Sequence, residues 1–168
     1  MNTKHLNILL ADDDLDDCNF FKHALEELSL SAQLTTVHDG EQLMNYLSDN
    51  SSRNGGTDVI FLDINMPRKN GLECLSEIKR DPGLKDIPVV MFSTSNSWDT
   101  INMLFNSGSH VYIHKPSDFA QLKQVIQHAL PIAAEIIYSR NPLKYILNAS
   151  NGDRPKHAKT TEKETSEM

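Results

Sequence analysis

The sequence predicts an α/β fold in which a five-stranded parallel sheet is covered by helices on both faces. Five short apolar runs alternate with five stretches whose apolar residues recur every three or four positions. Strands that alternate with helices along a chain favour a parallel sheet buried on both sides. The chain has 168 residues, which is enough for one domain with its own core and some chain left over.

Each expected strand is a short apolar run bounded by polar or turn-forming residues. In chain order, the strands are expected at residues 6–11, 33–37, 58–62, 88–92 and 111–113. A stretch rich in Ser, Asn and Gly at residues 49–57 precedes the third strand and is expected to be a loop. None of the runs approaches the roughly 20 apolar residues that a membrane helix needs.

Each expected helix has one apolar face that can pack on the sheet. In chain order, the helices are expected at residues 15–28, 40–47, 71–80, 98–106 and 118–130. Asp14 is the expected N-cap of the first helix. The apolar face of that helix is expected to comprise Leu15, Cys18, Phe21, Leu25 and Leu28. Five strands and five helices in alternation indicate a doubly wound (βα)5 fold of the flavodoxin-like type.

Composition excludes several classes of protein. Lys and Arg number 16 and Asp and Glu number 23, so the net charge of −7 disfavours a nucleic-acid binder. Cys18 and Cys74 show no spacing typical of a disulfide framework or a zinc site, and we interpret both as core residues. The first residues lead directly into a strand, so we expect no secretory signal peptide, no membrane association and a cytoplasmic location.

The chain divides into three parts by composition. Residues 4–130 contain the whole alternating pattern and are expected to form one domain. Residues 131–150 form an apolar extension that contains Pro131 and Pro142. One hypothesis is that this extension is helical and packs back on the domain or makes a homodimer. Residues 151–168 have almost no apolar side chains, so we expect a disordered tail.

Polar residues follow four of the expected strands. In an open parallel sheet, ligands bind beyond the carboxyl ends of the strands, so these side chains should gather at one edge. They are Asp12, Asp13, Asp14, Asp63, Ser93, Thr94 and Lys115. Crowded carboxylates favour a neutralising divalent cation with oxygen ligands, most commonly Mg²⁺. An aspartate beside Mg²⁺ and a lysine can attack phosphorus and form an aspartyl phosphate.

Each of these residues also has an ordinary structural explanation. Residues 12–14 could cap a helix, because acidic side chains favour helix N-termini. Asp63 could be a turn residue, Lys115 a solvated loop lysine and Tyr112 a plain strand aromatic. The combination of these residue types at one edge of the sheet is what favours a functional site.

The order of these motifs resembles the receiver domain of response regulators in two-component signalling. The motifs are Ile8-Leu9-Leu10-Ala11-Asp12-Asp13, Asp63-x-Asn65-Met66-Pro67-x-x-Asn70-Gly71, Ser93-Thr94 and Tyr112-x-x-Lys115-Pro116. The resemblance covers about residues 4–130. The Phe92-Ser93-Thr94-Ser95 stretch and the long loop before the third strand are similar to the stand-alone receivers that act with bacterial phytochromes.

The resemblance implies a role for each matching residue. Asp63 would be the phosphoacceptor. The ligands of Mg²⁺ would be Asp12, Asp13, Asp63 and the backbone carbonyl of Asn65. The residues that contact the phosphoryl group or change position with it would be Ser93, Thr94, Lys115 and Tyr112. The residues that shape the neighbouring loops would be Met66, Pro67, Gly71 and Pro116, and the peptide bond before Pro116 would be cis.

The implied function is that of a single-domain response regulator. Asp63 would accept a phosphoryl group from a histidine kinase or a phosphotransfer protein, and the signal would pass by contact to a downstream protein that the sequence does not identify. The protein would not be a metabolic enzyme, although it could dephosphorylate itself. A homodimer could form through the extension, or through the face made by residues 98–106, 111–113 and 118–130.

Two alternatives remain open at this point. The first is a binding module with the same fold that works without phosphorylation. The second is a phosphohydrolase of the haloacid-dehalogenase type, which also uses an aspartate nucleophile. That class needs an aspartate as general acid two residues after the nucleophile, where this chain has Asn65, whose amide cannot protonate a leaving group.

Overall fold

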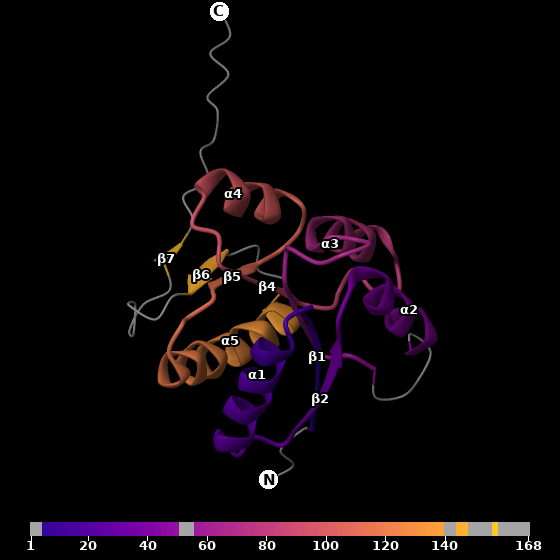
Figure 1. Cartoon of the computed structure of the whole chain (residues 1–168). Coiled ribbons are helices and arrows are strands. Elements are labelled where there is room, and N and C mark those ends of the chain that lie inside the picture. Colours follow the sequence, from indigo (N-terminus) through magenta and orange to yellow (C-terminus); the bar gives the residue numbers. More distant parts are fainter. Residues whose placement is uncertain (1–4, 51–55, 140–143, 148–155, 158–168) are drawn as a thin grey trace, which may run out of the picture.

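The five expected strands form the parallel core of one sheet (Figure 1). The computed structural model describes residues 5–50, 56–139, 144–147 and 156–157. The core strands are β1 (Leu6–Ala11), β2 (Ala32–Val37), β3 (Val59–Leu62), β4 (Val89–Ser93) and β5 (Val111–His114). Their spatial order is β2-β1-β3-β4-β5, and each neighbouring pair is parallel. The order reverses between β1 and β3, so the carboxyl ends of these two strands flank the expected binding crevice.

Helices cover both faces of the sheet (Figure 1). They are α1 (Leu15–Glu27), α2 (Gly40–Asn50), α3 (Gly71–Arg80), α4 (Trp98–Asn106) and α5 (Phe119–Ser139). The core under α1 and α5 includes Phe21, Phe61 and Ile126, and the core on the other face includes Leu43, Leu75 and Leu104. The doubly wound arrangement predicted from the alternating pattern is therefore confirmed.

Local signals fix the start of two helices. The Asp14 carboxylate accepts hydrogen bonds from the backbone N–H groups of Asp16 and Asp17, so it is the N-cap of α1 as predicted. Asn70 and Glu73 form a capping box at the start of α3. Leu15 was expected on the buried face of α1, but it is 62% exposed. It is the first residue of a helix that begins beyond the carboxyl end of β1, where the sheet no longer covers it.

The last helix continues past residue 130, where the sequence pattern placed its end, into the extension. Pro131 lies inside α5, which runs to Ser139 instead of ending near residue 130. A proline inside a helix costs about 3 kcal/mol, because it removes a backbone hydrogen bond and crowds the preceding turn. Here Leu130 and Ala133 are buried, and Ile132 and Ile136 pack against the same core. The burial of these apolar side chains offsets the cost and keeps the segment helical.

The extension adds one strand that the sequence pattern did not predict, and the tail that was expected to be disordered adds another. β6 (Tyr145–Leu147) pairs in parallel with β5, and β7 (Lys156–His157) pairs antiparallel with β6. The five expected strands therefore form the core of the sheet, but the sheet itself has seven strands. A three-residue run is too short to be recognised from periodicity alone. Apart from β7, the expected disordered tail lies outside the described residues, as does most of the loop before β3. No helix among the described residues is long and apolar enough to cross a membrane.

Candidate functional site

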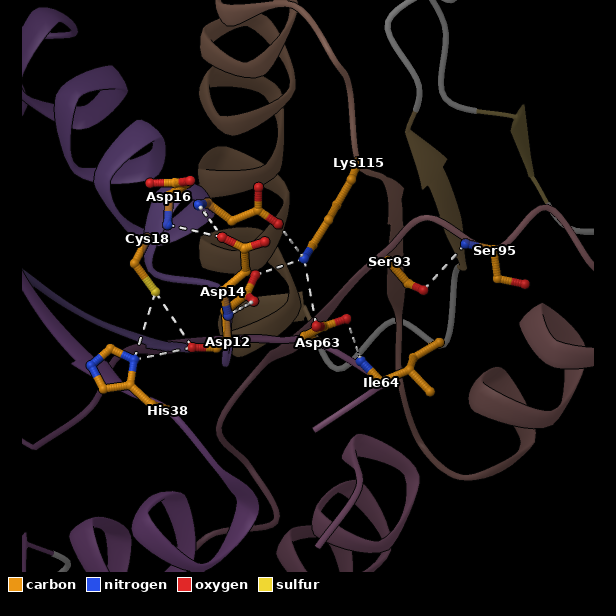
Figure 2. Close-up of polar contacts among 11 residues, drawn as sticks. Asp12, Asp14, Asp16, Cys18, His38, Asp63, Ile64, Ser93, Ser95 and Lys115 are labelled. Atoms are coloured by element: carbon orange, nitrogen blue, oxygen red, sulfur yellow. Dashed lines mark hydrogen bonds and ion pairs between the residues drawn. The ribbon is translucent and has the colours of Figure 1, made fainter. Parts of the chain in front are cut away.

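The carboxyl ends of the core strands bring the expected residues to one edge of the sheet. Asp12 and Asp13 follow β1, Asp63 follows β3, Ser93 ends β4 and Lys115 follows β5. In Figure 2, Lys115 extends toward Asp12 and Asp63, and Ser93 lies on the neighbouring strand. Residues more than 100 positions apart in the chain thus meet in one crevice, as the sequence predicted.

Three carboxylates lie close enough to share one cation. One carboxylate oxygen from each of Asp12, Asp13 and Asp63 lies within 4.8 Å of the others. Asp12 is 0% exposed and Asp63 is 7% exposed, whereas Asp13 is open to solvent. Asp12 Oδ1 accepts a hydrogen bond from the backbone N–H of Asp14, and Asp63 Oδ1 accepts one from Ile64. This all-oxygen set of anionic groups matches the ligands that a hard divalent cation prefers.

Lys115 is surrounded by carboxylates. Its Nζ donates to Asp12 Oδ2 at 2.7 Å and to Asp17 Oδ2 at 2.9 Å, and it lies 3.5 Å from Asp63 Oδ2. The side chain is 10% exposed, and Nζ lies 5.2 Å from the centre of the Phe92 ring. Sequence reasoning did not assign Asp17 to the site. The available signal was an acidic residue in the first turn of the helix that starts there, but such residues commonly serve only the helix dipole.

Burial and charge shift the pKa values of these groups in opposite directions. Burial raises the pKa of Asp63 to about 6, although the nearby Lys115 opposes the shift. Burial also raises the pKa of Asp12 against the effect of its hydrogen bond to Lys115. For Lys115, burial alone would lower the pKa, but the hydrogen bonds to Asp12 and Asp17 raise it above its usual range. The crevice therefore holds more negative charge than one ammonium group balances.

The residues expected to contact the phosphoryl group, or to change position with it, divide into buried and exposed side chains. Ser93 is 0% exposed, and its Oγ accepts a hydrogen bond from the backbone N–H of Ser95. Tyr112 is 1% exposed, and its hydroxyl donates to the backbone carbonyl of Ser95. Thr94, in contrast, has an exposed side chain. Ser93 and Tyr112 therefore both hold the short segment that follows β4, whereas the side chain of Thr94 is not drawn into the buried part of the site.

The loop after β3 is held tightly against Asp63. A Cβ atom at Gly71 would lie 2.1 Å from the backbone oxygen of Asp63, so only glycine fits at this position. The backbone N–H of Gly71 also donates to the carbonyl of Ile64. Met66 is buried in this loop, while Asn65 and Pro67 are exposed. The missing side chain at Gly71 and the burial of Met66 in the core therefore constrain the path of this loop.

The expectation of a cis bond before Pro116 is wrong for this structure. Every peptide bond among the described residues is trans. The trans form is intrinsically favoured even before proline, by about 0.5–1 kcal/mol. With this trans bond, the backbone N–H of Lys115 donates to the carbonyl of Ser93, and its side chain reaches the carboxylates.

A cleft of about 530 Å³ adjoins the site. Tyr112, Lys115 and Pro116 contribute to its walls, together with Trp98 at the start of α4 and Ile146 of β6. Trp98 is 62% exposed. The cleft connects the charged crevice with the surface formed by α4, β5 and the start of α5.

Comparison with known proteins identifies the family. Residues 8–127 match the response regulator receiver domain. Response regulator Rcp1 of Synechocystis is 32% identical over 125 residues, which span 71% of this chain and 83% of that protein. The probable methanogenesis regulatory protein FilR2 of Methanothrix harundinacea is 31% identical over 123 residues, or 71% of this chain and 78% of that protein. The chain therefore belongs to the response regulator receiver family, whose members are signalling proteins.

Solved structures agree with this assignment. The phosphorylated cyanobacterial phytochrome response regulator RcpA has a TM-score of 0.69 and 36% identity, over 82% of this chain and 97% of that one. The bacteriophytochrome response regulator AtBRR has a TM-score of 0.65 and 27% identity, over 78% of this chain and 94% of that one. The predicted similarity to receivers that act with phytochromes is thus confirmed by sequence and by structure.

Proposed function

We propose that Asp63 of this protein accepts a phosphoryl group from a histidine kinase or a phosphotransfer protein, in a reaction that depends on Mg²⁺. The observation that carries this proposal is the position of the Asp63 carboxylate, which lies 3.5 Å from the Lys115 ammonium and beside two further carboxylates. The charge of this arrangement suits a reaction that brings both a cation and phosphoryl oxygens to Asp63.

The transfer step needs the ionised form of Asp63. A carboxylate oxygen of Asp63 would attack phosphorus, and the oxygen–phosphorus bond would form as the nitrogen–phosphorus bond of the donor histidine breaks. The electron pair would return to the imidazole nitrogen, which takes up a proton from solvent. Burial raises the pKa of Asp63 only to about 6, so the carboxylate is mostly ionised at neutral pH.

The residues around Asp63 can balance the charge of the phosphoryl oxygens. Asp12, Asp13, Asp63 and the backbone carbonyl of Asn65 would hold Mg²⁺, which would offset negative charge on those oxygens when it is bound. The similar protein Rcp1 has been crystallised in a Mn²⁺-bound form, which supports a divalent cation at the acidic cluster. Lys115 would donate a hydrogen bond from a charged group to the phosphoryl oxygens, and Ser93 would donate one from its neutral hydroxyl. Thr94 would join them if its exposed side chain turned inward.

The response to phosphorylation would pass through the segment after β4. If the Ser93 hydroxyl turned toward the phosphoryl group, it would release the backbone N–H of Ser95, whose carbonyl binds Tyr112. A shift of Ser95 and Tyr112 would then change the surface formed by α4, β5 and α5. This is a population shift between two conformers, and a downstream protein or a second copy of the chain would recognise the favoured one.

The phosphodonor would approach over α1. Leu15 and Phe20 are 62% and 54% exposed on this helix, and Phe20 borders a small pocket that also contains Lys115 and Pro116. Exposed apolar side chains at the mouth of a charged crevice suit a protein partner. We infer that this transfer takes place in the cytoplasm.

The proposal is tested by the intact mass of the protein after incubation with acetyl phosphate and Mg²⁺. The wild type should gain one phosphoryl group, and Asp63→Asn should gain none. Asp16→Asn is the matched control, because it removes a carboxylate from the exposed side of α1 and should be labelled like the wild type. Chelation of Mg²⁺ should prevent labelling. An unlabelled wild type that also fails to bind Mg²⁺ would favour the binding module that works without phosphorylation.

A further inference from the structure

The Lys115 ammonium has a carboxylate partner outside the residues assigned to the phosphoryl site. Its shortest contacts are with Asp12 at 2.7 Å and Asp17 at 2.9 Å, whereas Asp63 lies farther away at 3.5 Å. Asp17 does not follow a strand but lies in the first turn of α1, where its backbone N–H is bound by the N-cap Asp14. Its side chain is 39% exposed, while that of Asp12 is fully buried.

We propose that Asp17 is a positioning residue that draws the Lys115 ammonium toward α1 and away from Asp63, and so competes with a phosphoryl group on Asp63 for this lysine. The inference rests on the proposed function, because it concerns whether the Lys115 ammonium is free to bind a phosphoryl group on Asp63. It assigns a role in the site to a carboxylate that needs neither to bind the cation nor to touch the phosphoryl group.

The number of donors on Lys115 explains the competition. An ammonium group has three N–H bonds, and Asp12 and Asp17 accept two of them at short distance. A phosphoryl oxygen on Asp63 can take the third, or it can displace one of the two carboxylates. Asp12 is buried and would lose a charged partner without water to replace it, which is unfavourable. Asp17 is partly exposed, so water can replace Lys115 as its partner. We therefore expect the phosphoryl group to displace Asp17 from Lys115.

The test measures affinity for fluoroberyllate with Mg²⁺, since this anion is a stable mimic of a phosphoryl group on a carboxylate. Asp17→Asn should tighten binding by about two- to five-fold, the range expected when a partly exposed ion pair is removed. Asp17→Glu keeps the carboxylate and should stay near the wild-type affinity. Asp16→Asn is the control for loss of one negative charge on the same turn, and it should change affinity less than Asp17→Asn.

A double-mutant cycle separates an effect through Lys115 from a general effect of charge. In a Lys115→Met background, Asp17→Asn should no longer change the affinity for fluoroberyllate. The same tightening with and without the lysine would overturn the inference. Equal effects of Asp17→Asn and Asp16→Asn would also overturn it.

A second measurement does not depend on phosphoryl chemistry. In the metal-free protein, the NMR signal of the Lys115 Cε group should move in Asp17→Asn and stay in place in Asp16→Asn. An unchanged Lys115 signal in Asp17→Asn would overturn the inference, even if the wild type accepts a phosphoryl group. A wild type that binds no fluoroberyllate and takes no label would instead count against the proposed function, and the NMR signal would still decide whether Asp17 positions Lys115.

Discussion

Two half-buried lysines lie at opposite ends of the sheet. Lys115 lies at the carboxyl ends of the strands among three carboxylates. Lys79 lies in the last turn of α3, and its Nζ donates to the backbone carbonyls of Lys85 and Ile87 just before β4. Burial lowers the pKa of Lys79 to about 8, although the charge of Asp86 opposes the shift. For Lys115, the carboxylates outweigh burial and raise the pKa.

The difference shows that satisfying hydrogen bonds is not the same as balancing charge. Two carbonyl groups accept hydrogen bonds from Lys79, but they are neutral dipoles and do not compensate a buried positive charge. The carboxylates around Lys115 do both. Lys79 therefore serves to fix a loop, whereas the partners of Lys115 can redistribute charge when a cation or an anion enters the crevice.

The largest expected change in the free energy of unfolding comes from replacing Lys115, with Lys79 as the comparison. In metal-free protein at neutral pH, Lys115→Met should lower the free energy of unfolding by about 3 kcal/mol, because Asp12 and Asp63 lose their shared cation. Lys79→Met should lower it by less than about 2 kcal/mol, since it leaves only neutral carbonyls without a donor. Urea unfolding in the presence of a chelator measures both. Equal losses in the two variants would contradict the conclusion that charged partners distinguish Lys115 from Lys79.

Removing the Asp63 carboxylate is expected to change the free energy of unfolding by less, and to raise it. The pKa of Asp63 is raised by burial to about 6, above its ordinary value of 3.8. The folded protein therefore binds this proton more tightly than the unfolded chain, so stability is lost progressively as the pH rises from about 3.8, and the loss is complete above about pH 6. Asp63→Asn should raise the free energy of unfolding by about 2 kcal/mol at pH 7 without metal, and by little at pH 3.5. The exposed Asp16→Asn should change little at either pH. A gain at pH 7 that persists at pH 3.5 would contradict this account.

The smallest expected effect is the pH dependence due to Lys79. Its pKa of about 8 in the folded protein is below the ordinary 10.5, so between these values the unfolded chain binds more protons. The contribution of Lys79 to stability must then rise with pH in this window. Between pH 7 and pH 9.5, the wild type should gain about 1–2 kcal/mol relative to Lys79→Met. Paired denaturation curves across this range measure the change, and parallel curves would show that burial does not perturb Lys79.

The sequence predicted most of the fold because its apolar runs and caps act locally. The bounds of α3 and α4 agree with the expected ones, and Asp14 caps α1 as predicted. Long-range packing explains the failures. Burial of its apolar face keeps α5 helical through Pro131, and Ile146 belongs to a strand because that strand pairs with β5, where Ile146 lies beside Tyr112. Neither contact leaves a periodic signal in the sequence.

Most of the candidate site was predictable because its residues directly follow strands. Asp12, Asp63 and Lys115 meet because strand ends meet at one edge. Asp17 enters from a helix, and only the direction of that helix and the length of the Lys115 side chain bring the two together. Thr94 is an exception to this rule, since it directly follows β4 yet has an exposed side chain.

The distance along the chain between the partners of Lys115 has a consequence for biosynthesis. The contact with Asp12 spans 103 positions and the contact with Asp17 spans 98. Contacts of this separation close late, because the entropy of the intervening chain must be lost first. A nascent chain that has not yet emerged beyond β5 has the carboxylates but not the ammonium group. Under the proposed function, such a chain on the ribosome would be a poor phosphoryl acceptor, so signalling would be reserved for molecules whose core is complete.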